Sequence, residues 1–374
     1  MVTEHGNNTP VRFQKLLKNK NNIDRMTLYI DEKTIKNIGD CDAVIDVRSP
    51  REFHEDHIIG SVNLPVLKNN EHEKVGTIYK NISPFEAKKI GARLVSLNIA
   101  SHLQTFFCDK KKSFKPLFYC ARGGQRSNSF ATICASIGWK CAVLDGGYKT
   151  YRKSVIREIE QFSKACTLIV ISGKTGNGKT EILSHISSLG GNILDLEGLA
   201  SHRGSMLGGF PGTEQPRQKY FETLLMEQIR KLDLSKPVFL EAESNKIGNV
   251  NIPAELFKKM HHSGCIVVEN SRQNRASFLV ARYSNVFEDE NVVEKFFEFL
   301  DSRHPADVAE KAKCFFSSKD WNALARHLLD YHYDPSYERS MGLKDRKILL
   351  HAKCNGDIEN TARDLACDII SKYG

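Results

Sequence analysis

The stretch Gly173-Lys174-Thr175-Gly176-Asn177-Gly178-Lys179-Thr180 decides the fold of the second half of this chain. It fits the pattern G-x-x-x-x-G-K-[ST], it follows the apolar run 167–171 (TLIVI), and a helical pattern over 180–188 comes next. In this strand–loop–helix context backbone N–H groups hold phosphate oxygens, the Lys neutralises their charge, and the Thr hydroxyl can reach a Mg²⁺ ion. The predicted phosphate-binding residues are Gly173, Gly176, Gly178, Lys179 and Thr180.

Further apolar strands alternate with helices after this loop, which indicates a largely parallel sheet and an α/β domain of the P-loop NTPase type. The predicted strands cover 192–195, 238–241 and 265–269. After about residue 285 the strand pattern stops and amphipathic patterns predict helices. These helices cover 291–300, 305–315, 321–331 and 358–372. We assign 165–374 to a P-loop domain with a helical C-terminal extension.

Polar residues that follow these strands are candidate ligand contacts, because parallel α/β domains bind ligands at the carboxyl ends of their strands. Glu241 and Glu243 occupy the place of a Walker-B carboxylate, where they would act as an acid or hold a metal ion. Glu in place of Asp leaves metal binding open, and a solvated strand end is the alternative. His202 and Arg203 lie in a long Gly-rich segment and are predicted anion contacts. A surface loop without a ligand is the alternative there.

The first half of the chain shows a second α/β pattern. Its predicted elements are strands over 43–47, 116–120 and 142–145 and a helix over 127–137. Ser49-Pro50-Arg51-Glu52 places Ser at the N-cap, Pro at the first helical position and Glu three residues after the cap, so a helix should begin at Pro50. We assign 27–160 to a parallel-sheet domain and 1–26 to a disordered leader.

Cys120 ends a predicted strand, and Arg126 opens the helix that follows the loop. The loop N–H groups, the positive end of the helix, and the guanidinium groups of Arg122 and Arg126 all favour a thiolate, which lowers the pKa of the thiol and makes the sulfur nucleophilic. The predicted catalytic residues are therefore Cys120, Arg122 and Arg126. A structural Cys is the alternative. The pattern fits sulfur-type transfer and also Cys-x5-Arg phosphatase chemistry, although Tyr119 stands where such phosphatases usually have His.

Composition excludes several classes of protein. The 374 residues contain no apolar stretch of about 18 residues, so no membrane span is predicted. The ten Cys are dispersed without a CxxC pair, and the N-terminus has no apolar signal core, which together predict a reducing, cytoplasmic setting.

The net charge of +9 is concentrated in one part of the chain. Residues 101–165 hold twelve Lys and Arg against four acids, a net charge of +8. Lys149, Arg152 and Lys153 in this segment are predicted contacts to a nucleic-acid backbone, because cations that displace counterions supply the sequence-independent part of such binding. A solvated charged face is the alternative.

The first half resembles a rhodanese domain. The residues that carry the resemblance are Asp46-Val47-Arg48, Glu52-Phe53, His57-Ile58, Gly60 and Asn63-Leu64-Pro65, together with the Cys120 loop. The chain departs from that pattern at Asp56, where Gly is usual, and its active loop is one residue longer than in common rhodaneses. The resemblance implies a rhodanese-like parallel-sheet fold with a reactive thiol at Cys120.

A rhodanese-like half followed by a P-loop half resembles the tRNA 2-selenouridine synthases. Outside the P-loop, the matching stretches are Val75-Gly76-Thr77-x-Tyr79-Lys80, Tyr119-Cys120, Arg122–Ser127, Gly146-Gly147-Tyr148-Lys149-x-Tyr151-Arg152, Asp195-Leu-Glu197, His202–Ser205, Glu241-Ala-Glu243-Ser244, Lys246-Ile247-Gly248 and Tyr333-Asp334-Pro335-x-Tyr337. The chain departs at Ala121, where this family usually has Trp.

This resemblance implies a transferase that acts on 2-thiouridine at the wobble position of tRNA. In the family the sulfur is first alkylated with geranyl diphosphate, and selenophosphate then supplies selenium while the geranylated sulfur leaves. The implied partners are thus tRNA, selenophosphate and geranyl diphosphate, and a Mg²⁺ ion is compatible with the P-loop. Our hypothesis is that the P-loop holds the diphosphate and Cys120 handles the selenium species.

Two other functions share these motifs. The main alternative is a rhodanese-type sulfurtransferase fused to an ATP-dependent kinase that acts on a small molecule. A tRNA-binding scaffold with a vestigial rhodanese is a second alternative, and the intact Cys120 and Lys179 argue against it.

Overall fold

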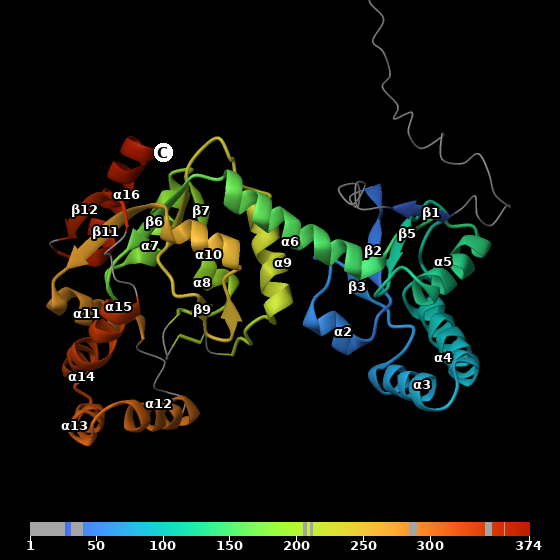
Figure 1. Ribbon diagram of the computed structural model, residues 1–374, viewed down its shortest axis with the longest axis horizontal. Helices are drawn as coiled ribbons and strands as arrows, with labels where there is room; N and C mark the ends of the chain where they lie inside the picture. Colours follow the sequence, from blue (N-terminus) through green and yellow to red (C-terminus); the bar gives the residue numbers. More distant parts are fainter. Residues whose placement is uncertain are drawn as a thin grey trace, which may run out of the picture. The chain divides into compact units, whose positions relative to one another are not determined.

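The computed structural model describes residues 27–30, 40–204, 208–209, 212–283, 290–340, 346–354 and 356–374. The chain forms two compact units, Met1–Ser154 and Val155–Gly374 (Figure 1). The predicted leader over 1–26 lies outside the described residues. No helix in the described ranges has both the length and the apolar character needed to cross a membrane.

A five-stranded parallel sheet with the order β1-β5-β4-β2-β3 forms the first unit. Its strands are β1 (Thr27–Ile30), β2 (Ala43–Asp46), β3 (Val62–Asn63), β4 (Pro116–Tyr119) and β5 (Cys141–Leu144). Its helices are α2 (Pro50–Glu55), α3 (Asn69–Asn81), α4 (Pro84–Thr105), α5 (Gln125–Ile137) and the first part of α6 (Gly147–Ala165). The predicted α/β architecture of this half is confirmed, as are the strands and the helix expected around Cys120.

Two local features of the first unit place its chemistry. The helix predicted to begin at Pro50 does so, with the full capping box: Ser49 N donates to Glu52 Oε2 at 3.0 Å and Glu52 N donates to Ser49 Oγ at 3.4 Å. The central strand β4 is wholly buried, and Phe118 packs in the core with Phe107 and Phe130. β4 runs parallel to both of its neighbours, β5 and β2. The loop that follows β4 therefore lies at the carboxyl edge of the sheet.

The second unit contains a five-stranded parallel sheet with the order β12-β11-β6-β8-β7 and a two-stranded antiparallel pair, β9 and β10. The strands are β6 (Leu168–Ser172), β7 (Asn192–Leu194), β8 (Val238–Glu241), β9 (Lys246–Ile247), β10 (Val250–Asn251), β11 (Gly264–Asn270) and β12 (Ile348–Cys354). The phosphate-binding loop follows the central strand β6, as the sequence predicted.

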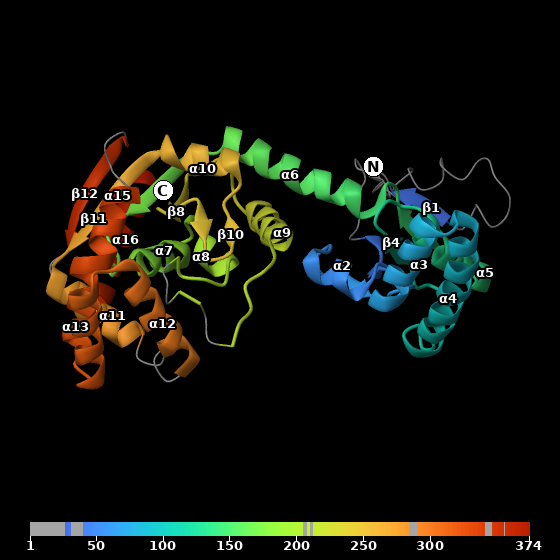
Figure 2. The same ribbon diagram turned by 60° about the horizontal axis from the view of Figure 1, so that its bottom comes forward.

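The helices of the second unit fall into two groups. Those near the sheet are α7 (Lys179–Ser188), α8 (Leu196–Leu199), α9 (Gln218–Ile229), α10 (Ala254–His261), α11 (Arg272–Arg282) and α16 (Ile358–Tyr373). The others are α12 (Glu290–Arg303), α13 (Ala306–Ser317), α14 (Trp321–Leu328), the π-helical turn η3 (Leu329–Tyr333) and α15 (Asp334–Ser340). α12, α13 and α14 share a small core of their own, and Figure 2 shows α12 and α13 together at one end of this unit.

The prediction that only helices follow residue 285 is wrong at β12. This strand pairs in parallel with β11 and forms an edge of the sheet. Its residues alternate, with Ala352 and Cys354 buried and His351 and Lys353 exposed, so it lacks the continuous apolar run that marks the inner strands. α16 then packs against α7. The C-terminal segment is therefore part of the core of the P-loop domain as well as a helical extension.

Candidate functional site

Cys120 is buried at the carboxyl end of β4 and is surrounded by hydrogen-bond donors. Its Sγ accepts a hydrogen bond from Gly124 N at 3.2 Å and another from Ser127 Oγ at 3.2 Å. Only 3% of Cys120 is exposed, and Ser127 is fully buried. The loop that follows β4 thus curls around the sulfur, as expected for a cradle that stabilises negative charge.

Glycines allow the loop to take this shape. Gly123 has a φ of +63°, and a Cβ there would lie 2.7 Å from Gly146 N. Gly147 has a φ of +58°, and a Cβ there would lie 2.1 Å from Cys120 O. The turn at 146–147 packs directly against the Cys120 loop. Only Gly fits these close contacts at a positive φ. Tyr148 N also donates to Cys120 O at 2.8 Å, which fixes the backbone of the nucleophile.

The surroundings lower the pKa of Cys120 below its usual range. Burial by itself raises the pKa, but the Ser127 hydroxyl, backbone N–H groups of the loop and the positive charge of Arg126 together lower it by more. A thiolate is the nucleophilic form of cysteine. The geometry therefore suits Cys120 to covalent or group-transfer chemistry.

The two predicted arginines have different surroundings. The Arg126 guanidinium donates to Glu52 through two nitrogens, at 2.8 Å and 3.2 Å. Burial would raise the pKa of Glu52, but Arg126 and the Ser49 N–H lower it to about 2, so this carboxylate stays ionised. Arg122 is exposed. Arg126 therefore contributes its charge from a fixed position, while Arg122 extends from the loop to the solvent.

Asp56, the departure from the rhodanese pattern, is fully buried. It accepts a hydrogen bond from the Tyr148 hydroxyl at 2.7 Å, and its carboxylate lies 3.9 Å from Arg152. The predicted nucleic-acid contact Arg152 is thus partly buried beside an acid, whereas Lys149 and Lys153 are exposed on α6. Of the three basic candidates, the two lysines have the exposure that contact with a polyanion needs.

The phosphate-binding loop of the second unit has the backbone geometry that its sequence predicted. Gly176 and Gly178 have φ values of +85° and +74°. A Cβ on Gly173 would lie 2.6 Å from Val268 O, so the neighbouring strand β11 requires Gly there. Lys179 begins α7, and its Nζ donates to Gly173 O at 3.2 Å across the loop. In this position the ammonium group is available to phosphate oxygens at the start of a helix.

The loop opens into a cavity of about 610 Å³. The five predicted phosphate-binding residues line this cavity, and so do His202, Arg203, Glu241 and Glu243. The rest of the wall includes apolar and aromatic side chains that the sequence analysis did not assign to a site: Phe278, Leu279, Tyr283, Phe299, Tyr333 and Tyr337. The cavity therefore places apolar surface beside the predicted phosphate-binding residues.

His202 and Arg203 are held at the wall of the cavity by local contacts. His202 forms an isolated antiparallel bridge with Gly209, and the Arg203 guanidinium lies 5.0 Å from the centre of the Tyr283 ring. Burial lowers the pKa of His202, which favours its neutral form as a hydrogen-bonding group. Ser205, the last residue of the matching stretch His202–Ser205, lies outside the described residues.

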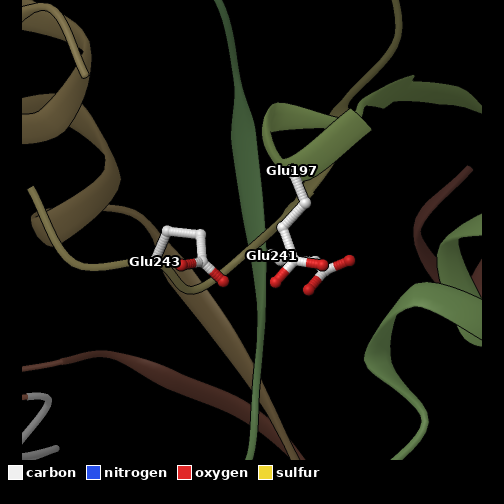
Figure 3. A group of neighbouring side chains, drawn as sticks. All are labelled: Glu197, Glu241 and Glu243. Atoms are coloured by element: carbon white, nitrogen blue, oxygen red, sulfur yellow. The ribbon is translucent and has the colours of Figure 1, made fainter. Parts of the chain in front are cut away.

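Three carboxylates meet beside the phosphate loop. Oxygens of Glu197, Glu241 and Glu243 lie within 4.8 Å of one another, and Figure 3 shows the side chains converging. Burial first, and then the charges of the other carboxylates, raise the pKa of Glu197 to about 10. Burial and the charge of Glu243 likewise raise the pKa of Glu241 to about 7, although Lys179 opposes this. Without a cation, the cluster therefore retains protons at neutral pH.

This oxygen-rich cluster fits a hard cation such as Mg²⁺. Glu241 is 3% exposed and its Oε1 has no hydrogen-bond partner among the described residues, while the Thr180 hydroxyl bonds the same carboxylate. A bound Mg²⁺ would compensate the negative charge of a diphosphate. Glu197 was missing from the predicted site residues. Its position directly after the predicted strand 192–195, within the matching stretch Asp195-Leu-Glu197, is the sequence signal that could have indicated it.

Both units match family models. Residues 31–154 match the rhodanese-like domain, and residues 166–304 match the tRNA 2-selenouridine synthase AAA domain. A structure of the N-terminal domain of a protein from Clostridium difficile 630, described as ATP/GTP binding, is 40% identical, covers 34% of this chain and 98% of that one, and gives a TM-score of 0.30.

Several curated relatives carry one name. The tRNA 2-selenouridine synthase of Nitrosomonas europaea is 37% identical over 70% of this chain and 66% of its own length. That of Bdellovibrio bacteriovorus is 37% identical over 66% of this chain and 64% of its own length, so these matches span slightly less than two thirds of the relatives. The Aeromonas salmonicida protein is 29% identical over 83% of this chain and 90% of its own length. The chain belongs to the tRNA 2-selenouridine synthase family.

Proposed function

We propose that this protein is a tRNA-modifying transferase that replaces sulfur by selenium in 2-thiouridine at the wobble position of tRNA. The observation that carries the proposal is the presence, in one chain of this family, of a cradled thiol of lowered pKa and a phosphate-binding cavity with apolar walls. The relatives' shared name supports the same substrate class. Replacement proceeds in two steps, alkylation of the sulfur and then its displacement.

The first step uses geranyl diphosphate in the P-loop cavity. Loop N–H groups and Lys179 bind the diphosphate and stabilise the charge that develops as it leaves. The side chains of Phe278, Leu279 and Phe299 supply apolar surface that suits a hydrocarbon chain. The thiouridine sulfur forms a bond to the geranyl carbon, the carbon–oxygen bond to diphosphate breaks, and the base loses its N3 proton.

The second step uses selenophosphate at the Cys120 loop. The N–H groups around Cys120 and the exposed Arg122 suit an anionic donor. The Cys120 thiolate is a nucleophile that can accept the phosphoryl group of the donor as the selenium–phosphorus bond breaks. At the nucleoside, the bond from C2 to selenium forms and the bond from C2 to sulfur breaks, so geranylthiolate leaves and takes up a proton. The selenium–phosphorus bond breaks, and water then releases the phosphoryl group as phosphate. Prior alkylation aids this step because an alkyl thiolate leaves C2 more readily than sulfide does.

The tRNA backbone is the proposed partner of the basic segment 101–165. Lys149 and Lys153 are exposed on α6 and lie close in sequence to the turn that supports the Cys120 loop. Phosphate contacts of this kind position a nucleic acid without reading its bases. Mg²⁺ at Glu197, Glu241 and Glu243 is the proposed counterion of the diphosphate.

Mass spectrometry of nucleosides tests the proposal. tRNA that contains wobble 2-thiouridine is incubated with the protein, geranyl diphosphate and selenophosphate, and each co-substrate is then omitted in turn. We expect 2-selenouridine in the full reaction and S-geranyl-2-thiouridine when selenophosphate is omitted. Unchanged 2-thiouridine in the full reaction would reject the proposal. Consumption of ATP with a small-molecule acceptor would favour the sulfurtransferase–kinase alternative.

A further inference from the structure

The segment formed by η3 and α15 carries a row of acids at every fourth residue. Asp330 pairs with Arg272 at 3.0 Å, Asp334 pairs with Arg275 at 2.5 Å, and Glu338 pairs with Lys174 at 2.8 Å. Arg272 and Arg275 belong to α11, and Lys174 belongs to the phosphate loop. One face of this segment is thus held to α11 and the loop by ion pairs.

Arg275 is the buried one among the basic residues that pair with this row of acids. It also contacts the phosphate loop directly. Its side chain is 5% exposed. Its Nη1 and Nη2 donate to the two carboxylate oxygens of Asp334 at 3.0 Å and 2.5 Å, while its Nε donates to Thr175 O at 2.8 Å. A guanidinium can make these three bonds at once because its donors form a planar fork, and a lysine ammonium cannot reproduce that geometry.

The bond to Thr175 O determines the direction of a loop N–H. In a planar trans peptide the C=O and the next N–H point in opposite directions. Because Thr175 O points to Arg275, the N–H of Gly176 points away from Arg275. Gly176 lies close against Arg275, since a Cβ there would be 3.1 Å from Arg275 O, and both Thr175 and Gly176 line the cavity. Phosphate binding by such a loop depends on the directions of its N–H groups.

One further contact joins the same segment to the base of the loop, and other residues of the segment line the cavity. The hydroxyl of Tyr337 lies 2.7 Å from the hydroxyl of Ser172, the residue before Gly173. His332 and Tyr333 of the π-helical turn line the cavity. The segment therefore contacts the loop from outside and bounds the ligand space with its other residues.

We propose that Arg275, oriented by Asp334, is a positioning residue for the diphosphate: it fixes the peptide between Thr175 and Gly176 so that the Gly176 N–H serves the bound phosphate. The inference rests on phosphate binding in the proposed function. It also assigns a role to the stretch Tyr333-Asp334-Pro335-x-Tyr337, whose Asp holds Arg275 and whose second Tyr holds Ser172.

Calorimetric titration of the full chain with inorganic diphosphate tests this inference. Arg275→Lys keeps the charge but loses the fork, and Asp334→Asn leaves Arg275 without its ionic partner. We expect diphosphate binding to weaken at least tenfold in Arg275→Lys and several-fold in Asp334→Asn. Arg272→Lys and Asp330→Asn are matched controls, because they alter the neighbouring ion pair of the same row, and these should stay within about twofold of the unaltered chain.

The outcomes separate this inference from the proposed function. Failure of the unaltered chain to bind diphosphate would overturn both. Equal affinity in the unaltered chain and in Arg275→Lys would overturn only the positioning role. A loss of affinity in all four variants that follows their thermal midpoints would also overturn it, because that pattern indicates general destabilisation. If Arg275→Lys does not fold, Asp334→Asn compared with Asp330→Asn decides the question.

Discussion

The Cys120 loop and the P-loop are both strand–loop–helix cradles, but the pKa values of the carboxyl groups beside them shift in opposite directions. In the first unit Glu52 is paired with Arg126 at 2.8 Å, and its pKa falls to about 2. In the second unit three carboxylates gather beside Lys179, and the pKa of Glu197 rises to about 10. The first cradle is thus charge-balanced around a nucleophile, while the second holds more acid than base and suits a cation together with an anionic ligand.

Loss of the nucleophile should give the largest effect and should affect only the first cradle. Cys120→Ala is expected to lower formation of 2-selenouridine at least about a thousandfold, because no other group replaces the thiolate. Formation of S-geranyl-2-thiouridine should continue. Nucleoside mass spectrometry measures both products, and Cys108→Ala, at an exposed Cys, is the control. Normal selenium incorporation in Cys120→Ala would refute the assignment of the thiol.

Loss of the P-loop lysine should give the complementary result. Lys179→Ala is expected to slow geranylation about a hundredfold, since one charge on the leaving diphosphate is no longer compensated. The rate at which iodoacetamide alkylates Cys120 should not change. The exposed Lys236→Ala is the control, and the initial rate of S-geranyl product formation is the measurement. An equal loss of Cys120 reactivity would contradict the separation of the two sites.

The opposite pKa shifts predict opposite pH dependence of stability in the metal-free protein. Glu197 and Glu241 have raised pKa values, so their contribution is present below about pH 4.5 and is lost as pH rises through 7 and 10. Glu197→Gln should therefore raise the free energy of unfolding at pH 9 by about 1–2 kcal/mol.

Glu52 gives the matched opposite case. Its pKa is lowered from 4.5 to about 2, so its contribution is present above pH 4.5 and is lost as pH falls toward 2. Glu52→Gln should lower the free energy of unfolding at pH 7 by about 2 kcal/mol, and the difference should shrink as pH falls from 4.5 toward 2. Urea denaturation across pH measures both variants. Parallel pH profiles for the two would contradict the contrast.

Removal of one donor to the sulfur should have a smaller effect. Ser127→Ala deletes the hydroxyl that donates to Cys120 Sγ at 3.2 Å, which should raise the pKa of Cys120 and slow its alkylation by iodoacetamide several-fold at pH 7. The difference should disappear at high pH, where both thiols are ionised. A pH-independent decrease would instead indicate a collapsed loop.

The exposed lysines should give the smallest effect per residue. Lys149→Ala and Lys153→Ala are each expected to weaken tRNA binding a few-fold and to lower the slope of log affinity against log salt by about 1. Filter binding at several salt concentrations measures this, with Lys236→Ala as the control. An unchanged salt slope in the double variant would place the tRNA backbone on other residues.

Local patterns made much of this molecule predictable. The capping box at Ser49, the strand before Cys120 and the P-loop glycines depend on residues a few positions apart, and the structure has them where the sequence predicted. The sequence did not predict β12, because an edge strand with one buried face has a weak, alternating pattern. Its formation also depends on pairing with β11, which lies far from it in the chain.

The sequence by itself determined the two α/β units, the cradled thiol and the phosphate loop, because each follows from short-range spacing and from the directions of backbone N–H groups. Tertiary structure alone decided which charges meet. Glu197 joins Glu241 because β7 lies beside β8, Arg126 is held by Glu52 from α2, and Arg275 reaches Asp334 across 59 positions of the chain. Electrostatic interactions depend on the distance between charges in space and on their burial, and local sequence determines neither.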